Sequence, residues 1–137
     1  MRDLAYAAGA IDCDGTIGYI GRNPHAMVSL GNTNSAIPAW LEERFGGAIY
    51  EQPVGKGVRG AHPNWRGLQT WMISGQAAVE FLKKIRPWLI QKQAQAKLVI
   101  EATEATARTG YRLTPEQKAL RADYKSRINV LNRRGVA

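Results

Sequence analysis

Two aspartates, Asp12 and Asp14, stand one residue apart in the segment Ala7-Ala8-Gly9-Ala10-Ile11-Asp12-Cys13-Asp14-Gly15. Carboxylates are ligands for Mg²⁺, which activates water and stabilises the leaving oxygen when a phosphodiester is hydrolysed. Residues 2–13 are rich in alanine and have no β-branched residue before Ile11, which predicts a helix. The Asp14-Gly15 pair predicts its end, so Asp14 is expected at the C-terminal end of a helix. The plain structural alternative is that both aspartates only end the helix.

The rest of the chain predicts an α+β domain that spans residues 1–137. Strands are expected at 16–22, 25–30, 48–52 and 65–73, and helices at 35–45, 75–85, from Pro87 to about 107, and at 114–131. Ser35 is expected to cap the first of these helices, and Thr114 and Gln117 form a capping box for the last. The two αββ halves predict one four-stranded antiparallel sheet with helices on one face.

The charge balance favours a polyanionic partner. The chain has 19 Lys and Arg against 11 Asp and Glu, a net charge of +8. Residues 107–137 hold eight basic and two acidic residues, so the last helix and its flanks are strongly basic. Nucleic acid is therefore the first partner to test.

A single cysteine excludes an internal disulfide and a cysteine-based zinc site. No apolar run resembles a signal peptide or a membrane span, so an intracellular protein without a membrane partner is expected.

Segment 7–15 resembles the motif of the LAGLIDADG homing endonuclease family, with alanine at Ala7 and Ala10 in place of leucine and Cys13 in place of alanine. The resemblance continues through the Phe45-Gly46-Gly47 junction and residues 81–96, which are similar to the single-motif, homodimeric members. It covers residues 4–100 in order. Lys92 matches the active-site lysine of that group, and Asn32 matches a polar residue that positions water near the metal. For Asn32 alone, an Asx turn before the next helix is an equal alternative.

The resemblance implies the αββαββα fold, a homodimer and Mg²⁺-dependent cleavage of both strands of a long pseudo-palindromic double-stranded DNA target. It implies that Asp14 and the backbone carbonyl of Cys13 bind the metal, and that Lys92 supports the phosphate electrostatically. Small residues let two motif helices approach closely, so Ala7, Ala8 and Ile11 are expected at the dimer interface.

Side chains alternate along a strand, and this alternation selects the residues expected to face DNA. Counting by twos from Asp14 selects Thr16, Ile20 and Arg22. On the next strand the resemblance selects Asn23, His25 and Ser29, whereas counting by twos from Asn32 would select the other set of residues. For the last strand the resemblance favours Gln69 and Trp71 as the residues that face DNA. If the opposite face of this strand is turned to DNA, Arg66 is the expected contact. The long loop adds Lys56 and Arg59 as contacts to the outer ends of the target.

Two other functions remain open from the sequence. Asp12-Cys13-Asp14-Gly15-Thr16 is similar to the signature of haloacid-dehalogenase-type phosphatases, but that signature needs a preceding β-strand and a later acidic pair, which the chain lacks. A non-cleaving DNA- or RNA-binding relative, such as an intron maturase or a regulator, would keep the same fold and charge.

Overall fold

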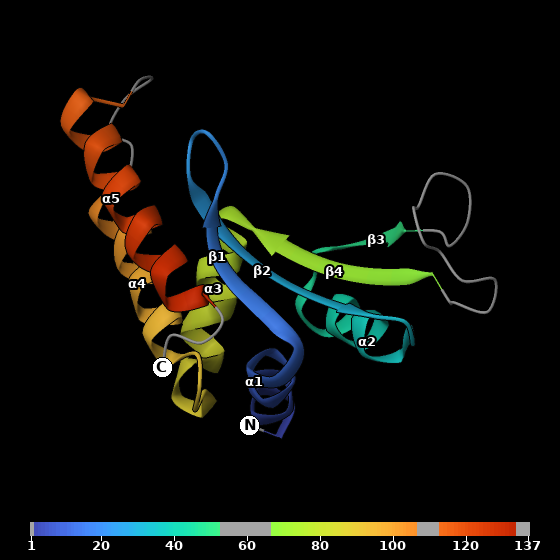
Figure 1. Ribbon diagram of the computed structural model, residues 1–137. Coiled ribbons are helices and arrows are strands. Elements are labelled where there is room, and N and C mark those ends of the chain that lie inside the picture. The colour runs from blue at the N-terminus through green and yellow to red at the C-terminus, as the bar shows by residue number, and fades with distance from the viewer. Residues whose placement is uncertain (1, 53–66, 107–112, 134–137) are drawn as a thin grey trace.

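The computed structural model describes residues 2–52, 67–106 and 113–133, which form a twisted antiparallel sheet packed against helices (Figure 1). In chain order the elements are α1 (Arg2–Asp14), β1 (Gly15–Ile20), β2 (His25–Asn32), α2 (Ala36–Phe45), β3 (Ala48–Gln52), β4 (Leu68–Ser74), α3 (Gly75–Ile85), the short 3₁₀ helix η1 (Arg86–Trp88), α4 (Gln93–Ala105) and α5 (Pro115–Asn132). The strand order is β1-β2-β4-β3, and every neighbouring pair is antiparallel. The predicted α+β class and four-stranded sheet are confirmed. No helix in the described ranges is long and apolar enough to cross a membrane.

One face of the sheet forms the core with the helices, and the other is left open. The strand residues that join the core cluster are Ile17, Tyr19, Ala26, Val28, Leu30, Trp71 and Ile73. Because side chains alternate along a strand, the residues between these point to the opposite face, which no helix of the described ranges covers (Figure 1). We call this second surface the open face. The alternation predicted for Thr16, Ile20, His25 and Ser29 is confirmed, whereas Arg22 and Asn23 lie in the turn between the two strands.

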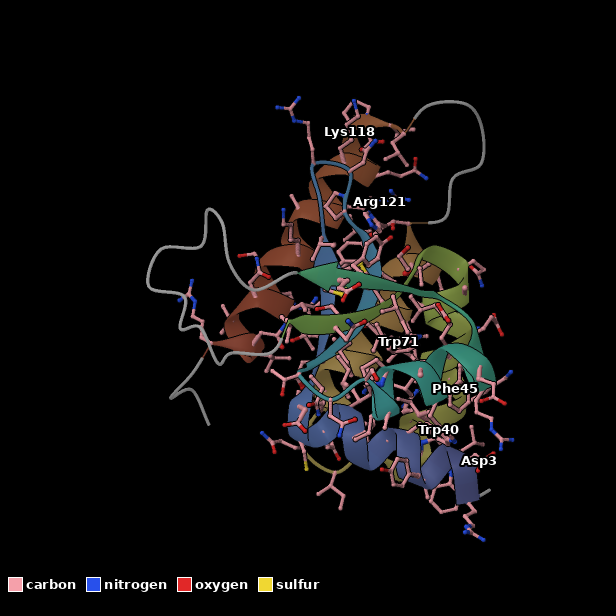
Figure 2. The ribbon with its side chains drawn as sticks, turned by 90° about the vertical axis from the view of Figure 1, so that its right-hand side faces the viewer. Asp3, Trp40, Phe45, Trp71, Lys118 and Arg121 are labelled. Carbon is pink, nitrogen blue, oxygen red and sulfur yellow. The ribbon has the colours of Figure 1, made fainter. Side chains whose placement is uncertain are left out.

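A chain of aromatic rings connects the helices to the sheet. Tyr6 of α1 meets Trp40 of α2 edge to face at 5.0 Å between ring centroids, and Trp40 meets Phe45 at 5.8 Å. Phe45 then contacts Phe81 of α3 at 5.0 Å, and Phe81 contacts Trp71 of β4 at 5.3 Å. Figure 2 shows Trp40, Phe45 and Trp71 following one another between the helices and the strands. Edge-to-face pairs of this kind stabilise beyond their buried area, so they fix α2 and α3 on the sheet.

The last helix begins as its sequence predicts. The Gln117 amide donates to the Thr114 hydroxyl at 3.1 Å, and the Thr114 amide donates to the Gln117 side chain at 3.0 Å. Pro115 occupies the first helical position, where its missing N–H costs nothing. The predicted capping box is therefore confirmed.

Helix α5 lies along the free edge of β1 (Figure 1). The Asn132 amide donates to the Ile17 carbonyl at 2.8 Å, and the Lys125 amine donates to the Gly21 carbonyl at 3.0 Å. An exposed edge strand offers unpaired backbone groups to other chains, and α5 covers this one with side-chain donors.

One predicted helix start and one predicted helix cap are wrong. The helix expected from Pro87 is only the 3₁₀ turn η1, because Leu89 is extended (φ −73°, ψ 139°) and α4 begins at Gln93. Helix α2 is not capped by the Ser35 side chain; the Asn34 side chain accepts from the Ala36 amide at 2.9 Å instead. Ser35 itself already has helical backbone angles, which are unlike the extended angles typical of an N-cap residue.

An ion pair joins α3 to α4. The Lys83 amine donates to the Glu104 carboxylate at 2.7 Å and lies 4.0 Å from the Glu80 carboxylate. The hydrogen bond to Glu104 raises the pKa of Lys83 above its ordinary value; burial opposes this shift, and the charges of Glu104 and Glu80 add to it. Because these side chains are largely exposed, the pair contributes little to stability.

We predict that Trp71→Ala lowers the free energy of unfolding by about 3–5 kcal/mol. Trp71 is fully buried, and its indole N–H donates to the Gly46 carbonyl at 2.7 Å, so truncation leaves both a cavity and an unpaired acceptor. Urea unfolding followed by circular dichroism measures the change. Tyr50→Ala is the matched control, because Tyr50 pairs across to β4 but is 59% exposed, and we expect a change within about 0.5 kcal/mol. Equal losses in the two variants would contradict the assignment of faces.

Candidate functional site

The two motif aspartates have different surroundings. Helix α1 ends at Asp14 and β1 starts at Gly15 without a loop between them. A Cβ at position 15 would lie 2.8 Å from the Ile11 Cα atom, so this tight junction requires glycine. Asp12 points inward and is 8% exposed, whereas Asp14 is exposed at the corner between helix and strand.

The Asp12 carboxylate closes the start of α4. It accepts hydrogen bonds from the backbone amides of Ile90 at 2.7 Å, Gln91 at 3.2 Å and Lys92 at 2.9 Å. These amides directly precede α4, where N–H groups lack partners within the helix and favour an anion. Asp12 is therefore satisfied within the fold and is a structural group.

Lys92 makes the corresponding contact at the C-terminal end of α1. Its side-chain amine donates to the backbone carbonyls of Ile11 at 3.1 Å and Asp12 at 2.7 Å. Carbonyls at a helix C-terminus lack internal partners and favour a cation. We call the combined set of contacts between Asp12, Lys92 and the two helix ends the Asp12–Lys92 clamp. The clamp holds the charge of Lys92 at the end of α1 that carries Asp14.

The carboxylate of Asp14 has no hydrogen bond or ion pair among the described residues, and the same is true of the Cys13 side chain, which is exposed. The described ranges contain no cluster of three or more His, Cys, Asp or Glu side chains able to hold a metal. A Mg²⁺ site, however, often uses only one or two protein carboxylates, completed by water and substrate phosphates. Asp14 is therefore suited to supply one carboxylate of such a site.

Asn32 lies at the same end of the sheet but is engaged in a turn. Gly15 pairs with Leu30, so Asn32 lies two residues beyond the end of β1. Its side-chain oxygen accepts from the Asn34 amide at 3.0 Å, which is the Asx turn that the sequence offered as an alternative role. The Asx turn is confirmed; a role in positioning water stays a prediction.

The open face contains several of the residues predicted to face DNA. Thr16 pairs with Ser29 and Ile20 pairs with His25, all on the side away from the core cluster. Arg22 and Asn23 are exposed in the turn between β1 and β2. Lys56, Arg59 and Arg66 lie outside the described residues.

On β4 the predicted face is wrong. Trp71 is fully buried in the core, and Gln69, two residues away, shares its side of the strand. The open face instead receives Thr70, Met72 and, from β3, Tyr50, which pairs with Thr70. Sequence reasoning missed these residues, although the other alternation of the strand, the one that includes Arg66, would have found them.

The motif residues predicted at the dimer interface are also misassigned. Ala7, Ala8 and Ile11 are fully buried within the single chain, so they have no surface to offer to a partner. The exposed side of α1 is formed by the residues Arg2, Tyr6, Gly9 and Cys13. These follow the helical spacing of four, three and four residues and form one stripe, and a Cβ at Gly9 would meet nothing within 4 Å.

The helical conformation of residues 2–14 also makes the phosphatase interpretation wrong, because that signature must follow a β-strand.

Comparison with solved structures places this fold beside homing endonucleases. The homing endonuclease I-CvuI in complex with its target in the presence of Ca is 19% identical, with a TM-score of 0.76, covering 99% of this chain and 86% of that one. I-CvuI in complex with the I-CreI target in the presence of Mg, with the DNA not cleaved, is 19% identical with a TM-score of 0.73, covering 96% and 82%. The archaeal intron-encoded homing endonuclease I-Vdi141I complexed with DNA is 16% identical with a TM-score of 0.74, covering 98% and 86%.

The chain shares the fold of these LAGLIDADG homing endonucleases over nearly its whole length. No sequence-family model matches it, and a search of curated proteins finds no relative. The likeness is therefore one of structure, at a sequence identity below 20%.

We predict opposite effects on stability for the two aspartates. Asp12→Asn removes one of the acceptor oxygens that hold three backbone amides, and we expect the free energy of unfolding to fall by about 1–3 kcal/mol. Asp14→Asn removes an unpaired anion from a helix C-terminus, and we expect a gain of about 0.3–1 kcal/mol. Thermal and urea unfolding of both variants measures these changes. A loss at Asp14 as large as that at Asp12 would show that Asp14 is structural as well.

Proposed function

We propose that this protein is a LAGLIDADG homing endonuclease that acts as a homodimer and makes Mg²⁺-dependent double-strand breaks in a long pseudo-palindromic DNA target. The observation that carries the proposal is the shared fold, over 96–99% of the chain, with homing endonucleases solved on DNA. The motif aspartate Asp14, exposed and unpaired at the end of α1, supports it.

The distribution of charge suits binding to a duplex. The open face carries hydroxyl, imidazole and apolar side chains, and its described strand residues Thr16, Ile20, His25, Ser29, Thr70 and Met72 include no lysine or arginine. Such side chains can read base edges in the major groove, where hydroxyls and methyl contacts distinguish base pairs. The net charge of +8 must then act on the phosphates from the edges of the sheet.

The catalytic step is assigned to the end of α1. Asp14 and the Cys13 carbonyl would hold Mg²⁺, which when bound activates water and stabilises the leaving oxygen. Lys92 places its ammonium group 2.7 Å from the Asp12 carbonyl, so its positive charge lies beside the site where the phosphate gains negative charge. Asn32, at the same end of the sheet, is the candidate to orient water.

Each chain supplies one Asp14, so cleavage of two strands calls for two copies related by a two-fold axis. The exposed stripe of α1 is the surface that we assign to this contact. Gly9 leaves room for a second helix, and Ile90, which is 91% exposed, lies beside the C-terminal end of α1 because its amide bonds to Asp12. A large exposed apolar side chain close to an exposed helix face is typical of an interface.

The second candidate is a non-cleaving DNA- or RNA-binding relative, such as an intron maturase or a regulator. The engagement of Asn32 in a turn favours it, because the residue expected to position water is partly committed elsewhere. The exposed and unpaired Asp14 favours the nuclease.

We predict Mg²⁺-dependent cleavage of a randomised double-stranded DNA library into paired breaks within a pseudo-palindromic sequence. Asp14→Asn should lower the cleavage rate by at least about 1000-fold and leave DNA affinity within about twofold, because its carboxylate would bind the metal rather than the DNA. Sequencing of the cut ends and a filter-binding titration provide the two readouts. Tight binding by the wild type without any cleavage would refute the nuclease and favour the maturase or regulator.

We predict that Gly9→Trp converts the dimer to a monomer without unfolding the chain. The new ring has free space in a single chain but would collide with a second α1. Sedimentation velocity should give twice the 15.1 kDa chain mass for the wild type and the single mass for the variant. Glu101→Trp, at an exposed position of α4, is the matched control and should stay dimeric. A dimer that survives Gly9→Trp would rule out this face.

A further inference from the structure

A cavity of about 690 Å³ lies between the β1–β2 turn and helix α5. Its lining includes four basic residues, Arg22 from the turn and Lys118, Arg121 and Lys125 from α5. Figure 2 shows Lys118 and Arg121 together at the end of the molecule where the β1–β2 turn lies. Among the residues that the structure describes, no acidic side chain lines the cavity.

Two of these basic residues are held in place by the fold. Arg121 donates to the carbonyl of Thr106, at the end of α4, at 2.9 Å and to the Thr106 hydroxyl at 3.1 Å. Lys125 donates to the Gly21 carbonyl at 3.0 Å. Arg121 also donates to the Pro24 carbonyl of the turn at 3.5 Å. Both side chains are half-buried and already ordered, so each loses less conformational entropy on binding an anion than a free side chain would.

The positive charges in this cavity are not neutralised by the protein. All 11 side-chain carboxylates of the chain lie within the described residues, and none forms an ion pair with Arg22, Lys118, Arg121 or Lys125. The hydrogen-bond partners of Arg121 and Lys125 are neutral oxygens.

Helix α5 separates its charges by face. Lys118, Arg121 and Lys125 follow helical spacing on the cavity side, whereas Asp123 pairs with Arg127 at 3.8 Å, and neither lines the cavity. Four like charges gathered around one space repel one another, and an anion in that space removes the repulsion. The Ser126 and Asn129 side chains add neutral hydrogen-bond donors to the same wall.

We propose that this cavity, which we call the turn–α5 pocket, binds the phosphodiester backbone of the DNA target beyond the outer end of the sheet. The inference rests on the proposed function and deepens it, because it adds a phosphate site on α5 to the open face. Arg22 belongs to the turn that joins Ile20, at the end of β1, to His25, at the start of β2. Both of these strand residues lie on the open face. A duplex lying on the open face therefore continues directly to the pocket, where several donors fit phosphate oxygens.

The test is DNA affinity as a function of salt, with the double variant Arg22→Gln and Lys118→Gln. No side-chain bond to either residue supports the fold among the described residues, so the variant should fold normally. The proposed homodimer carries two such pockets, so the variant removes four phosphate contacts from one complex. We expect the slope of log affinity against log salt to fall by about 3–4 and the affinity at about 100 mM salt to fall more than about tenfold. Arg127→Gln is the control, because it removes one positive charge from a residue of α5 that does not line the cavity, and it should change the slope by well under one.

Varying the length of the duplex distinguishes binding in the pocket from a general effect of net charge on DNA affinity. On duplexes of about 30 base pairs the double variant should bind more weakly than the wild type, and on duplexes of about 12 base pairs, which end before the pocket, the two should bind equally. Equal affinity of the variant and the wild type at every length overturns the inference while leaving the nuclease proposal intact. A loss confined to double-stranded RNA also overturns it. A wild type that binds no DNA at any length overturns the proposed function itself.

Discussion

The reciprocal contact between Asp12 and Lys92 is the constraint on which the rest of the site depends. One charged side chain satisfies the amides before α4, and the other satisfies the carbonyls at the end of α1. Each helix end thereby receives the charge that its dipole favours, and the two ends are held together. Because Asp14 follows two residues after Asp12, the same contact fixes the position and the exposure of the proposed metal ligand. The carboxylate of Asp12 thus stabilises the fold, whereas that of Asp14 stays exposed for the proposed chemistry.

Local signals in the sequence predicted the elements well, and long-range contacts account for the errors. The capping box of α5 needs only Thr114 and Gln117, three residues apart, so it was predictable. The start of α4 was not, because the amides before it bond to Asp12, about 80 residues earlier in the chain. A proline at position 87 indicated a helix start, but only the tertiary contact decides where the regular helix begins.

Alternation along a strand predicts two faces without saying which one is buried. For β1 the helix end at Asp14 supplied the reference, and the assignment of Thr16 and Ile20 to the open face was right. For β4 no such reference existed. Trp71 enters the core because its ring packs against Phe81 and its N–H reaches the Gly46 carbonyl, 25 residues away. For α1 the sequence likewise did not show which side is buried, because small residues occupy both sides of the helix. In the structure Ala7 and Ala8 are buried in the core.

The separation of neutral and charged surfaces has a consequence for recognition. The described strand residues of the open face have no lysine or arginine, whereas four cations without an ion pair, Arg22, Lys118, Arg121 and Lys125, line the cavity between the turn and α5. In such an arrangement the edges supply most of the salt-dependent affinity, and the strands supply most of the discrimination between bases. Under the proposed function the two properties can change independently, since a substitution at Ser29 or Thr70 leaves the proposed phosphate contacts at the turn and α5 untouched. A scaffold of this kind can acquire a new target sequence through its strands while its affinity for DNA, and the position of Asp14 set by the clamp, stay the same.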